Sequence, residues 1–264
     1  MAKNDNTKTS RQQAQRPAKQ QADQQSRRRV GQLRPIRIQR GFTDLAAGSV
    51  LIEMGRTQVL CTASFEAGVP RWREGSGRGW VTAEYSMLPG STSPRKARSR
   101  AGHTDSRGSE IQRMVGRVLR AVVDVARLGE NTIYLDCDVL QADGGTRTAA
   151  VNGCYTALVD SVQCKLDEGS ISDNPLTGAA AAVSVGIVEG KAVLDLDYDL
   201  DHRAEVDMNI AMTDKGEFIE LQGTAEQGTF TEEQLSAMLQ LARQGIKKIL
   251  RLQKQSLKTK PGRI

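Results

Sequence analysis

The sequence predicts one mixed α/β (α+β) domain in which groups of antiparallel strands alternate with helices. Short stretches with an apolar residue at every second position alternate along the chain with longer stretches that have helical spacing. No Gly-, Pro- or Ser-rich linker interrupts residues 34–250. A chain of 264 residues can also bury a substantial core, which must be largely aliphatic because only 4% of the residues are aromatic.

We expect this single domain to span residues 30–252, between two basic tails at residues 1–29 and 253–264. Residues 1–29 contain almost no apolar side chain, so they cannot bury enough surface to fold and are expected to be disordered. They carry eight Lys or Arg and two Asp, which equals the whole net charge of +6. A tail that binds nucleic acid and a tail that only improves solubility fit this composition about equally.

Four strands and a helix are predicted in the first half of the chain. Alternation marks the strands at residues 35–41, 48–55, 57–64 and 80–87. The helix is expected from Ser109 to Leu128, because Ser109 and Gln112 fit a capping box and an apolar stripe follows them. Gly129 then provides a C-terminal cap.

The centre of the chain has the pattern of a strand, a glycine turn and a second helix. Residues 132–139 alternate as a strand, residues 143–145 break it, and helical spacing runs from Ala149 to Leu166 with Thr146 or Thr148 as its cap. Further strands are predicted at residues 178–188, 192–200, 205–213 and 217–222, and the last two form a hairpin. Thr231 begins a capping box for the final helix.

The glycine turn suggests an anion site. The first N–H groups of a helix have no partner within it and carry partial positive charge. Gly145 allows an anion to approach them, and Arg147 adds a guanidinium group suited to phosphate oxygens. We therefore predict a phosphate site at Gly145, Thr146 and Arg147, although an ordinary glycine turn fits the spacing equally well. Arg107 can reach an anion at the start of the preceding helix in the same way.

Residues 89–108 form a second candidate segment. They have no hydrophobic period and carry five Lys or Arg against a single carboxylate, that of Asp105. Twenty residues without regular structure are uncommon in a compact domain and are usually functional or disordered. The concentrated charge favours a contact with RNA or with another subunit, and a solvated loop is the alternative.

Acidic residues crowd positions 195–207. Strand alternation would place Asp195, Asp197, Asp199 and Asp201 on one side of a strand, where they repel one another unless a cation lies among them. Asp201 and Asp207 flank the predicted turn, and we favour these two as Mg²⁺ ligands or acid/base partners. The alternative is an exposed edge strand on which charge prevents pairing with other chains.

The rarer residue types exclude several kinds of protein. With only two histidines, the chain cannot build a His-rich di-metal hydrolase. The four cysteines form no CxxC pair and lie in apolar patterns, as expected for buried, reduced thiols in a cytoplasmic protein. No run approaches the roughly 18 apolar residues of a membrane span.

Six blocks of the chain resemble the bacterial ribonuclease PH family. They are RGWVTAEYSMLP (78–89), SRGSEIQRMVGRVLRA (106–121), LDCDVLQADGGTRTA (135–149), AAVSVGIV (181–188), DMNIAMT (207–213) and ELQGTAE (220–226). The resemblance implies a duplicated βαβ fold of the ribosomal protein S5 domain 2 type. It also implies a phosphate-dependent 3′→5′ exoribonuclease, a nucleotidyltransferase that trims tRNA precursors and releases nucleoside diphosphates.

The same resemblance implies roles for particular residues. Arg107 and the Gly145-Thr146-Arg147 turn would hold the phosphate, and Asp201 and Asp207 would carry catalysis with Mg²⁺. Arg95 and Arg98 would bind tRNA across a homohexamer built as a trimer of dimers. Gly90 stands where the family often has an arginine, so one RNA contact is missing or moved. The competing hypothesis is a non-catalytic, RNA-binding ring subunit of an exosome-like assembly.

Overall fold

The computed structural model describes residues 28–98, 105–226 and 228–262. Its helices and strands follow the chain in this order: β1 (Ile36–Arg40), β2 (Gly48–Met54), β3 (Thr57–Ala67), η1 (Arg71–Arg73), β4 (Trp80–Met87), η2 (Pro89–Ser91), α2 (Ser106–Arg120), β5 (Asn131–Gln141), α3 (Thr146–Asp167), β6 (Ala180–Val188), β7 (Lys191–Leu194), α4 (Tyr198–Arg203), β8 (Val206–Thr213), β9 (Phe218–Ala225) and α5 (Glu232–Ser256).

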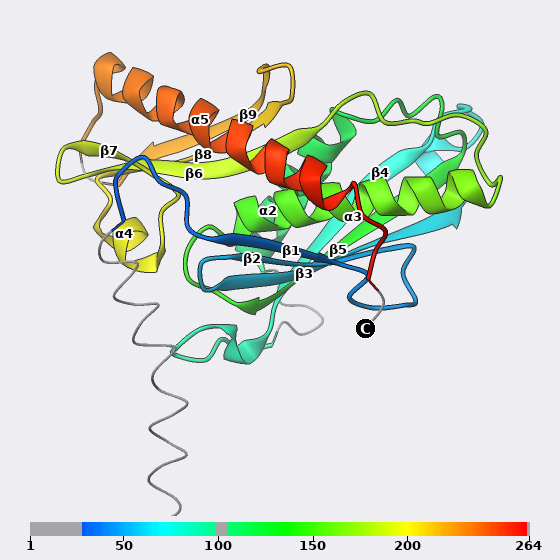
Figure 1. Ribbon diagram of the computed structural model, residues 1–264, viewed down its shortest axis with the longest axis horizontal. Helices are drawn as coiled ribbons and strands as arrows, with labels where there is room; N and C mark the ends of the chain where they lie inside the picture. Colours follow the sequence, from blue (N-terminus) through cyan, green and yellow to red (C-terminus); the bar gives the residue numbers. More distant parts are fainter. Residues whose placement is uncertain (1–27, 99–104, 227, 263–264) are drawn as a thin grey trace, which may run out of the picture.

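The strands form two sheets with helices between and above them. The five-stranded sheet has the order β1-β2-β3-β5-β4, and only its β4–β5 pair is parallel. The four-stranded sheet is antiparallel with the order β7-β6-β8-β9. Helices α2 and α3 lie between the sheets, and α5 crosses the other side of the four-stranded sheet (Figure 1). Every residue of β6 is buried, because helices cover both of its faces.

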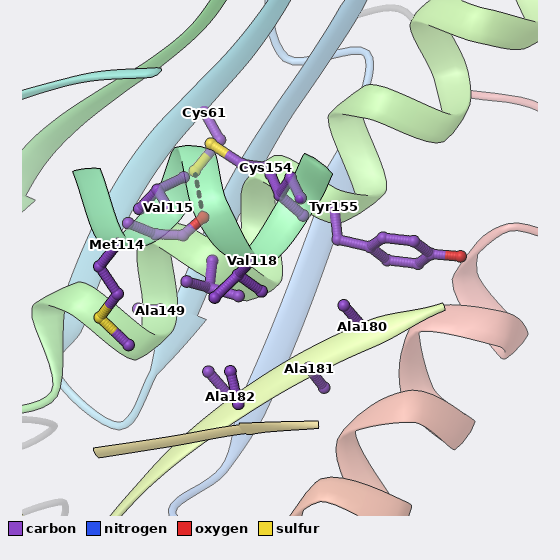
Figure 2. Close-up of a cluster of buried hydrophobic side chains, with 14 of the residues drawn as sticks. Cys61, Met114, Val115, Val118, Ala149, Cys154, Tyr155, Ala180, Ala181 and Ala182 are labelled. Carbon is purple, nitrogen blue, oxygen red and sulfur yellow. Dashed lines mark hydrogen bonds between the residues drawn. The ribbon is translucent and has the colours of Figure 1, made fainter. Parts of the chain in front are cut away.

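Helix α3 occupies the middle of the molecule. Fifteen of its 22 residues are buried, so it has no solvated face along most of its length. Small side chains allow this packing: a Cβ added to Gly153 would lie 2.5 Å from the sulfur of Cys61. Figure 2 shows Cys154 and Tyr155 of α3 in the same cluster as the alanines of β6. This buried cluster includes residues of both sheets, although the extent of the single domain stays a prediction.

Several predicted elements are confirmed, and others begin or end elsewhere. The predicted strand at 80–87 and the capping box of Thr231 with Gln234 are both present. The first long helix begins at Ser106 rather than Ser109, because the Asp105 carboxylate accepts a hydrogen bond from the N–H of Gly108 and so caps the helix earlier. That helix ends at Arg120, eight residues before the predicted end at Leu128.

The central helix also begins earlier than predicted, and its cap is different. Gly145 is its N-cap, in a left-handed conformation with no side-chain cap, so the prediction of a threonine cap was wrong. Thr146 is instead the first helical residue, and the Thr148 hydroxyl donates to the Gly145 carbonyl oxygen at 3.0 Å.

The acidic segment does not form the predicted strand at 192–200. Strand β7 ends at Leu194, Asp195 has a φ of 60°, and the Asp197 carboxylate caps α4 by accepting from the N–H of Leu200. The predicted row of carboxylates on one side of a strand was therefore wrong. Asp195 and Asp197 are buried, and Asp199 and Asp201 lie on the surface of α4.

The predicted tails lie only partly within the described residues. Residues 1–27 and 263–264 lie outside them. The Arg28 side chain is 7% exposed and lies 3.4 Å from the carboxylate of Asp195. Helix α5 continues to Ser256 and buries Gln253. In the described part of the chain, no helix is both long and apolar enough to cross a membrane.

Candidate active site

The glycine turn that links β5 to α3 packs directly against the segment that leads into α4. Gly144 and Gly145 have φ values of 72° and 64°, which favour glycine. A Cβ on Gly144 would lie 2.6 Å from the carbonyl carbon of Asp197. The turn therefore brings the start of α3 next to the α4 helix that carries Asp201.

Buried side chains hold the carbonyl groups of this turn. Arg34 Nη1 donates to the carbonyl oxygen of Asp143 at 2.6 Å, and the Thr57 hydroxyl donates to that of Gly144 at 2.7 Å. The N–H of Asp143 in turn donates to the Thr57 hydroxyl at 2.9 Å. Because these carbonyls are engaged, the first N–H groups of α3 remain as the free polar groups of the turn, and they favour an anion.

Thr146 contributes a buried hydroxyl at the first position of α3. Its Oγ1 lies 2.9 Å from the Tyr85 hydroxyl, which projects from β4 of the five-stranded sheet. Burial raises the pKa of Tyr85, whereas the hydrogen bond to Thr146 and the positive charges of Arg107 and Arg147 lower it. Both predicted phosphate-binding arginines therefore act on the same phenol oxygen.

Arg147 follows in the first turn of α3 and is held by two other elements. Its Nη1 lies 3.3 Å from the Glu110 carboxylate of α2 and donates to Oε1 of Gln222 on β9 at 3.2 Å. Its side chain is 22% exposed, so part of it remains accessible to solvent.

Arg107 lies in the first turn of α2, where it is exposed. Together with Arg147 it acts electrostatically on Asp201 and on Tyr85. The two predicted phosphate-binding arginines thus come from the starts of two different helices, and both lie within electrostatic range of the same two side chains.

The two predicted catalytic carboxylates belong to a helix and a strand of the second half of the chain. Asp201 lies on α4 and Asp207 on β8. Although the Asp201 residue is exposed, partial burial of its carboxyl by neighbouring groups raises its pKa. The charges of Asp207 and Glu226 raise this pKa further, and those of Arg107 and Arg147 lower it. The result is a carboxyl group that holds its proton more readily than an ordinary aspartate.

Asp201 and Asp207 also suit a magnesium ion. Mg²⁺ usually binds through one or two carboxylates and completes its shell with water and substrate phosphates. Among the residues that the structure describes, no cluster of three or more His, Cys, Asp or Glu is arranged to hold a metal. The role of Asp201 and Asp207 as Mg²⁺ ligands stays a prediction.

Arg107, Arg147, Asp201 and Asp207 together form the candidate arginine–carboxylate site. Arg95 and Arg98 lie on the irregular segment after η2, and both are exposed. The segment is tied to α2, because Lys96 Nζ lies 2.6 Å from the carboxylate of Asp105, the N-cap of that helix. The cationic segment and Arg107 thus meet at one helix start. Residues 99–104, which complete the predicted loop, lie outside the described residues.

The sequence prediction missed four residues of the site, namely Arg34, Tyr85, Glu110 and Gln222. Arg34 belongs to the segment before β1 and reaches the glycine turn only through the tertiary fold. Tyr85, Glu110 and Gln222 all lie within the blocks that resemble the ribonuclease PH family. Those blocks were the available signal, but spacing alone gave these residues no separate role.

Comparisons with known proteins identify the family of the chain. Residues 32–162 match the model of the 3′ exoribonuclease family, domain 1, and residues 178–245 match domain 2 of the same family. The chain is 54% identical over 227 residues to ribonuclease PH of Corynebacterium efficiens, covering 86% of this chain and 93% of that protein. It is 53% identical to ribonuclease PH of Corynebacterium glutamicum, with the same coverage.

Solved structures share the fold at low sequence identity. Rice (Oryza sativa) Rrp46 aligns with a TM-score of 0.71 and 20% identity over 88% of this chain and 99% of that one. The Archaeoglobus fulgidus exosome with RNA bound to the active site aligns with a TM-score of 0.71 and 18% identity, over 85% of this chain and 90% of that one. From the two family domains and the relatives above half identity, the chain belongs to the ribonuclease PH family of 3′ exoribonucleases.

Proposed function

We propose that this protein is a phosphate-dependent 3′→5′ exoribonuclease that trims the 3′ ends of tRNA precursors and releases nucleoside diphosphates. Its relatives at 53–54% identity are ribonucleases PH. One observation supports the proposal: the glycine turn, whose helix begins with Thr146 and Arg147, packs against the backbone of Asp197, the N-cap of the helix that carries Asp201. A phosphate bound at that turn would therefore lie beside the predicted catalytic carboxylates. Phosphorolysis needs this juxtaposition, because an attacking phosphate and the scissile phosphodiester must be held side by side.

The proposed reaction exchanges one phosphoester for another. Orthophosphate is held between Arg107 and the Gly145–Arg147 turn, with the last phosphodiester of the RNA in line with it. A phosphate oxygen forms a bond to the terminal phosphorus, and the bond from that phosphorus to the 3′ oxygen of the preceding nucleotide breaks. The arginines stabilise the charge that develops on the phosphoryl oxygens.

The leaving 3′ oxygen must receive a proton. The raised pKa of Asp201 makes its carboxyl a suitable donor, directly or through water. In the alternative role of the pair, Asp201 and Asp207 would both be ionised and would hold Mg²⁺, which would add charge neutralisation at the scissile phosphate, and water would then supply the proton. Because a phosphate ester replaces a phosphate ester, the reaction is expected to be freely reversible.

Two further features belong to the same proposal. A homohexamer, a trimer of dimers, would align the Arg95 and Arg98 segments of neighbouring subunits along a bound tRNA, and light scattering of the purified protein would test it. A cytoplasmic location fits the four free cysteines, three of them buried. A non-catalytic ring subunit is less favoured, because such subunits typically lose charged residues of the site that this chain retains.

The proposal is tested by the identity of the product. A 3′-extended tRNA precursor is incubated with Mg²⁺, with and without inorganic phosphate, and the released nucleotides are separated by ion-exchange chromatography. We expect nucleoside diphosphates in proportion to phosphate and almost no release without it. Monophosphates in phosphate-free buffer would show hydrolysis instead, and the absence of any release would favour the non-catalytic subunit.

Arginine variants test the assignment of the site. Arg107→Ala and Arg147→Ala should each lower the turnover at least 100-fold, as removal of a group that stabilises transition-state charge does. Arg113→Ala is the matched control, because Arg113 is exposed on α2 and outside the site. Its turnover should equal that of the unaltered protein, and full activity of the two site variants would contradict the assignment.

A further inference from the structure

The Tyr85 hydroxyl lies within the arginine–carboxylate site but has no role in the reaction described above. It is 2.9 Å from the Thr146 hydroxyl, and the residues are only 6% and 5% exposed. Tyr85 is carried by β4, which pairs in parallel with β5, the strand that leads into the glycine turn. A rigid sheet therefore fixes the phenol oxygen against the first residue of α3.

Two hydroxyl groups that share one hydrogen bond have one proton to spare. Each hydroxyl carries a single proton, and only one of the two protons can lie between the oxygens. Within the described residues neither hydroxyl has a second hydrogen-bond partner. The remaining proton is therefore available to an acceptor other than the described residues.

The neighbouring charges indicate an anionic acceptor. Arg107 and Arg147 both act electrostatically on the Tyr85 hydroxyl, so two positive charges lie within range of it. Burial raises the pKa of Tyr85 above its ordinary value, and the phenol keeps its proton at neutral pH. A neutral donor pair in the field of these guanidinium groups is complementary to a phosphate oxygen.

We propose that Tyr85 is a positioning residue for the attacking phosphate: its hydroxyl orients that of Thr146, so that the pair donates one hydrogen bond to a phosphate oxygen. This inference rests on the proposed phosphorolytic function and adds a recognition element to the same site. Its specific consequence is that the pair acts on phosphate and has no direct effect on RNA binding.

Tyr155 provides a matched comparison within the same core. It is also buried, at 7% exposure, but its hydroxyl donates to the backbone carbonyl of Gly178 at 3.5 Å. It projects from α3 beside Ala180 of β6 (Figure 2). Replacing either tyrosine with phenylalanine removes one buried hydroxyl, and only Tyr85 lies at the phosphate site.

The first experiment compares Tyr85→Phe with Tyr155→Phe. Nucleoside diphosphate release is measured against phosphate concentration at saturating RNA, and against RNA concentration at saturating phosphate. We expect Tyr85→Phe to raise the KM for phosphate about tenfold, the size of a lost hydrogen bond to a charged group, and to leave the KM for RNA unchanged. Tyr155→Phe should change neither constant. Equal effects of the two variants, or an unchanged KM for phosphate in Tyr85→Phe, would overturn the proposal.

A double-mutant cycle tests whether Tyr85 acts through Thr146. Thr146→Val removes the hydroxyl with little change in shape, and the KM for phosphate is measured for both single variants and for the double variant. If the two hydroxyls act as a unit, Tyr85→Phe adds almost nothing once Thr146 is valine. If the increase in the KM for phosphate of the double variant equals the product of the two single increases, Tyr85 acts independently of Thr146 and the positioning role is refuted.

Failure of the proposed function can be separated from failure of this inference. Binding of inorganic phosphate to the full-length protein is measured by isothermal titration calorimetry, without RNA. A protein that binds phosphate but releases no nucleotide would refute the phosphorolytic function alone. In that case weaker phosphate binding by Tyr85→Phe than by Tyr155→Phe would still support the positioning role, and equal binding would reject it.

Discussion

Arg34 and Asp195 form an ion pair in which both side chains are fully buried, although 161 positions separate them in the sequence. The Asp195 carboxylate accepts from Arg34 Nη2 and from the Arg34 backbone N–H, each at 2.7 Å. The same guanidinium group donates to the carbonyl of Asp143. One arginine thus connects the segment before α4 with the glycine turn, and so holds the two parts of the arginine–carboxylate site together.

Replacing Arg34 should destabilise the protein strongly. Arg34→Met removes the guanidinium partner and leaves the buried Asp195 carboxylate with the backbone N–H of residue 34 and the weaker contact from Arg28. We expect a loss of about 3 kcal/mol in the free energy of unfolding. Arg37→Met is the control, because that side chain on β1 is 73% exposed and lies 3.8 Å from Glu53. Its effect should stay within about 0.5 kcal/mol. Urea denaturation measures both, and similar midpoints would contradict this account.

The glycine turn should tolerate no side chain at Gly144. Gly144→Ala combines an unfavourable φ with a Cβ 2.6 Å from the backbone of Asp197, so we expect a loss of about 2 to 4 kcal/mol in stability. Phosphorolysis should also fall, because α4 must move. Gly169→Ala is the control: its φ is 71° but nothing lies within 4 Å. It should cost only about 1 kcal/mol and keep its activity. Equal losses of stability in Gly144→Ala and Gly169→Ala would argue against close packing of the turn on α4.

Asp201 should cost the protein stability at neutral pH. Its pKa is raised in the folded state. The folded protein therefore binds more protons than the unfolded chain at pH values between the two pKa values of Asp201. Stability falls as the pH rises from the unfolded to the folded pKa. Asp201→Asn should raise the Tm at pH 7 by about 1 to 2 °C, a small gain because solvent screens an exposed group. The gain should shrink as the pH is lowered towards 4.

Calorimetry at several pH values measures this effect. Asp199→Asn provides the comparison, since Asp199 is exposed on the same short helix. A gain that is equally large in the control, or that grows as the pH falls, would mean that Asp201 is not the group responsible.

Arg95 and Arg98 should affect the binding of large RNA and leave the chemical step unchanged. Replacing both with alanine should weaken binding of a tRNA precursor and make the slope of log affinity against log salt less steep by about 1 to 2. Release from a short oligonucleotide should be unchanged. Filter binding at several salt concentrations measures the slope. Replacing the exposed Lys191 and Lys215 with alanine removes the same charge elsewhere, and an equal change of slope there would contradict a specific role.

Local patterns predicted most of the elements, and tertiary contacts decided the rest. The strand at 80–87 and the Thr231 cap depend on neighbouring residues, so the sequence predicted them well. The predicted start of α2 was wrong because both Asp105 and Ser109, four residues apart, can cap a helix, and Asp105 is the residue that does so. The strand predicted at 192–200 was wrong because Asp195 turns away to meet Arg34, a partner that no local pattern reveals.

The arginine–carboxylate site likewise has a part that local sequence patterns predict and a part that depends on tertiary contacts. Five consecutive residues, 143–147, predicted an anion site at the glycine turn, and this site stays a prediction. In the structure, Arg107 and Arg147 both act electrostatically on Asp201. Tyr85, Glu110 and Gln222 contact the turn from β4, α2 and β9, so their relation to it depends on the packing of two sheets and a helix. Their functional roles stay predictions until the variants described above are measured.

The site draws its cations and its carboxylates from opposite halves of the chain. Arg107 and Arg147 belong to the first family domain, whereas Asp201 and Asp207 belong to the second. Cutting the polypeptide between residues 168 and 177 would give one fragment able to attract phosphate and another able to attract a metal ion. Neither fragment could cleave RNA alone, so recovered cleavage on mixing them would directly report reassembly of the interface between the sheets.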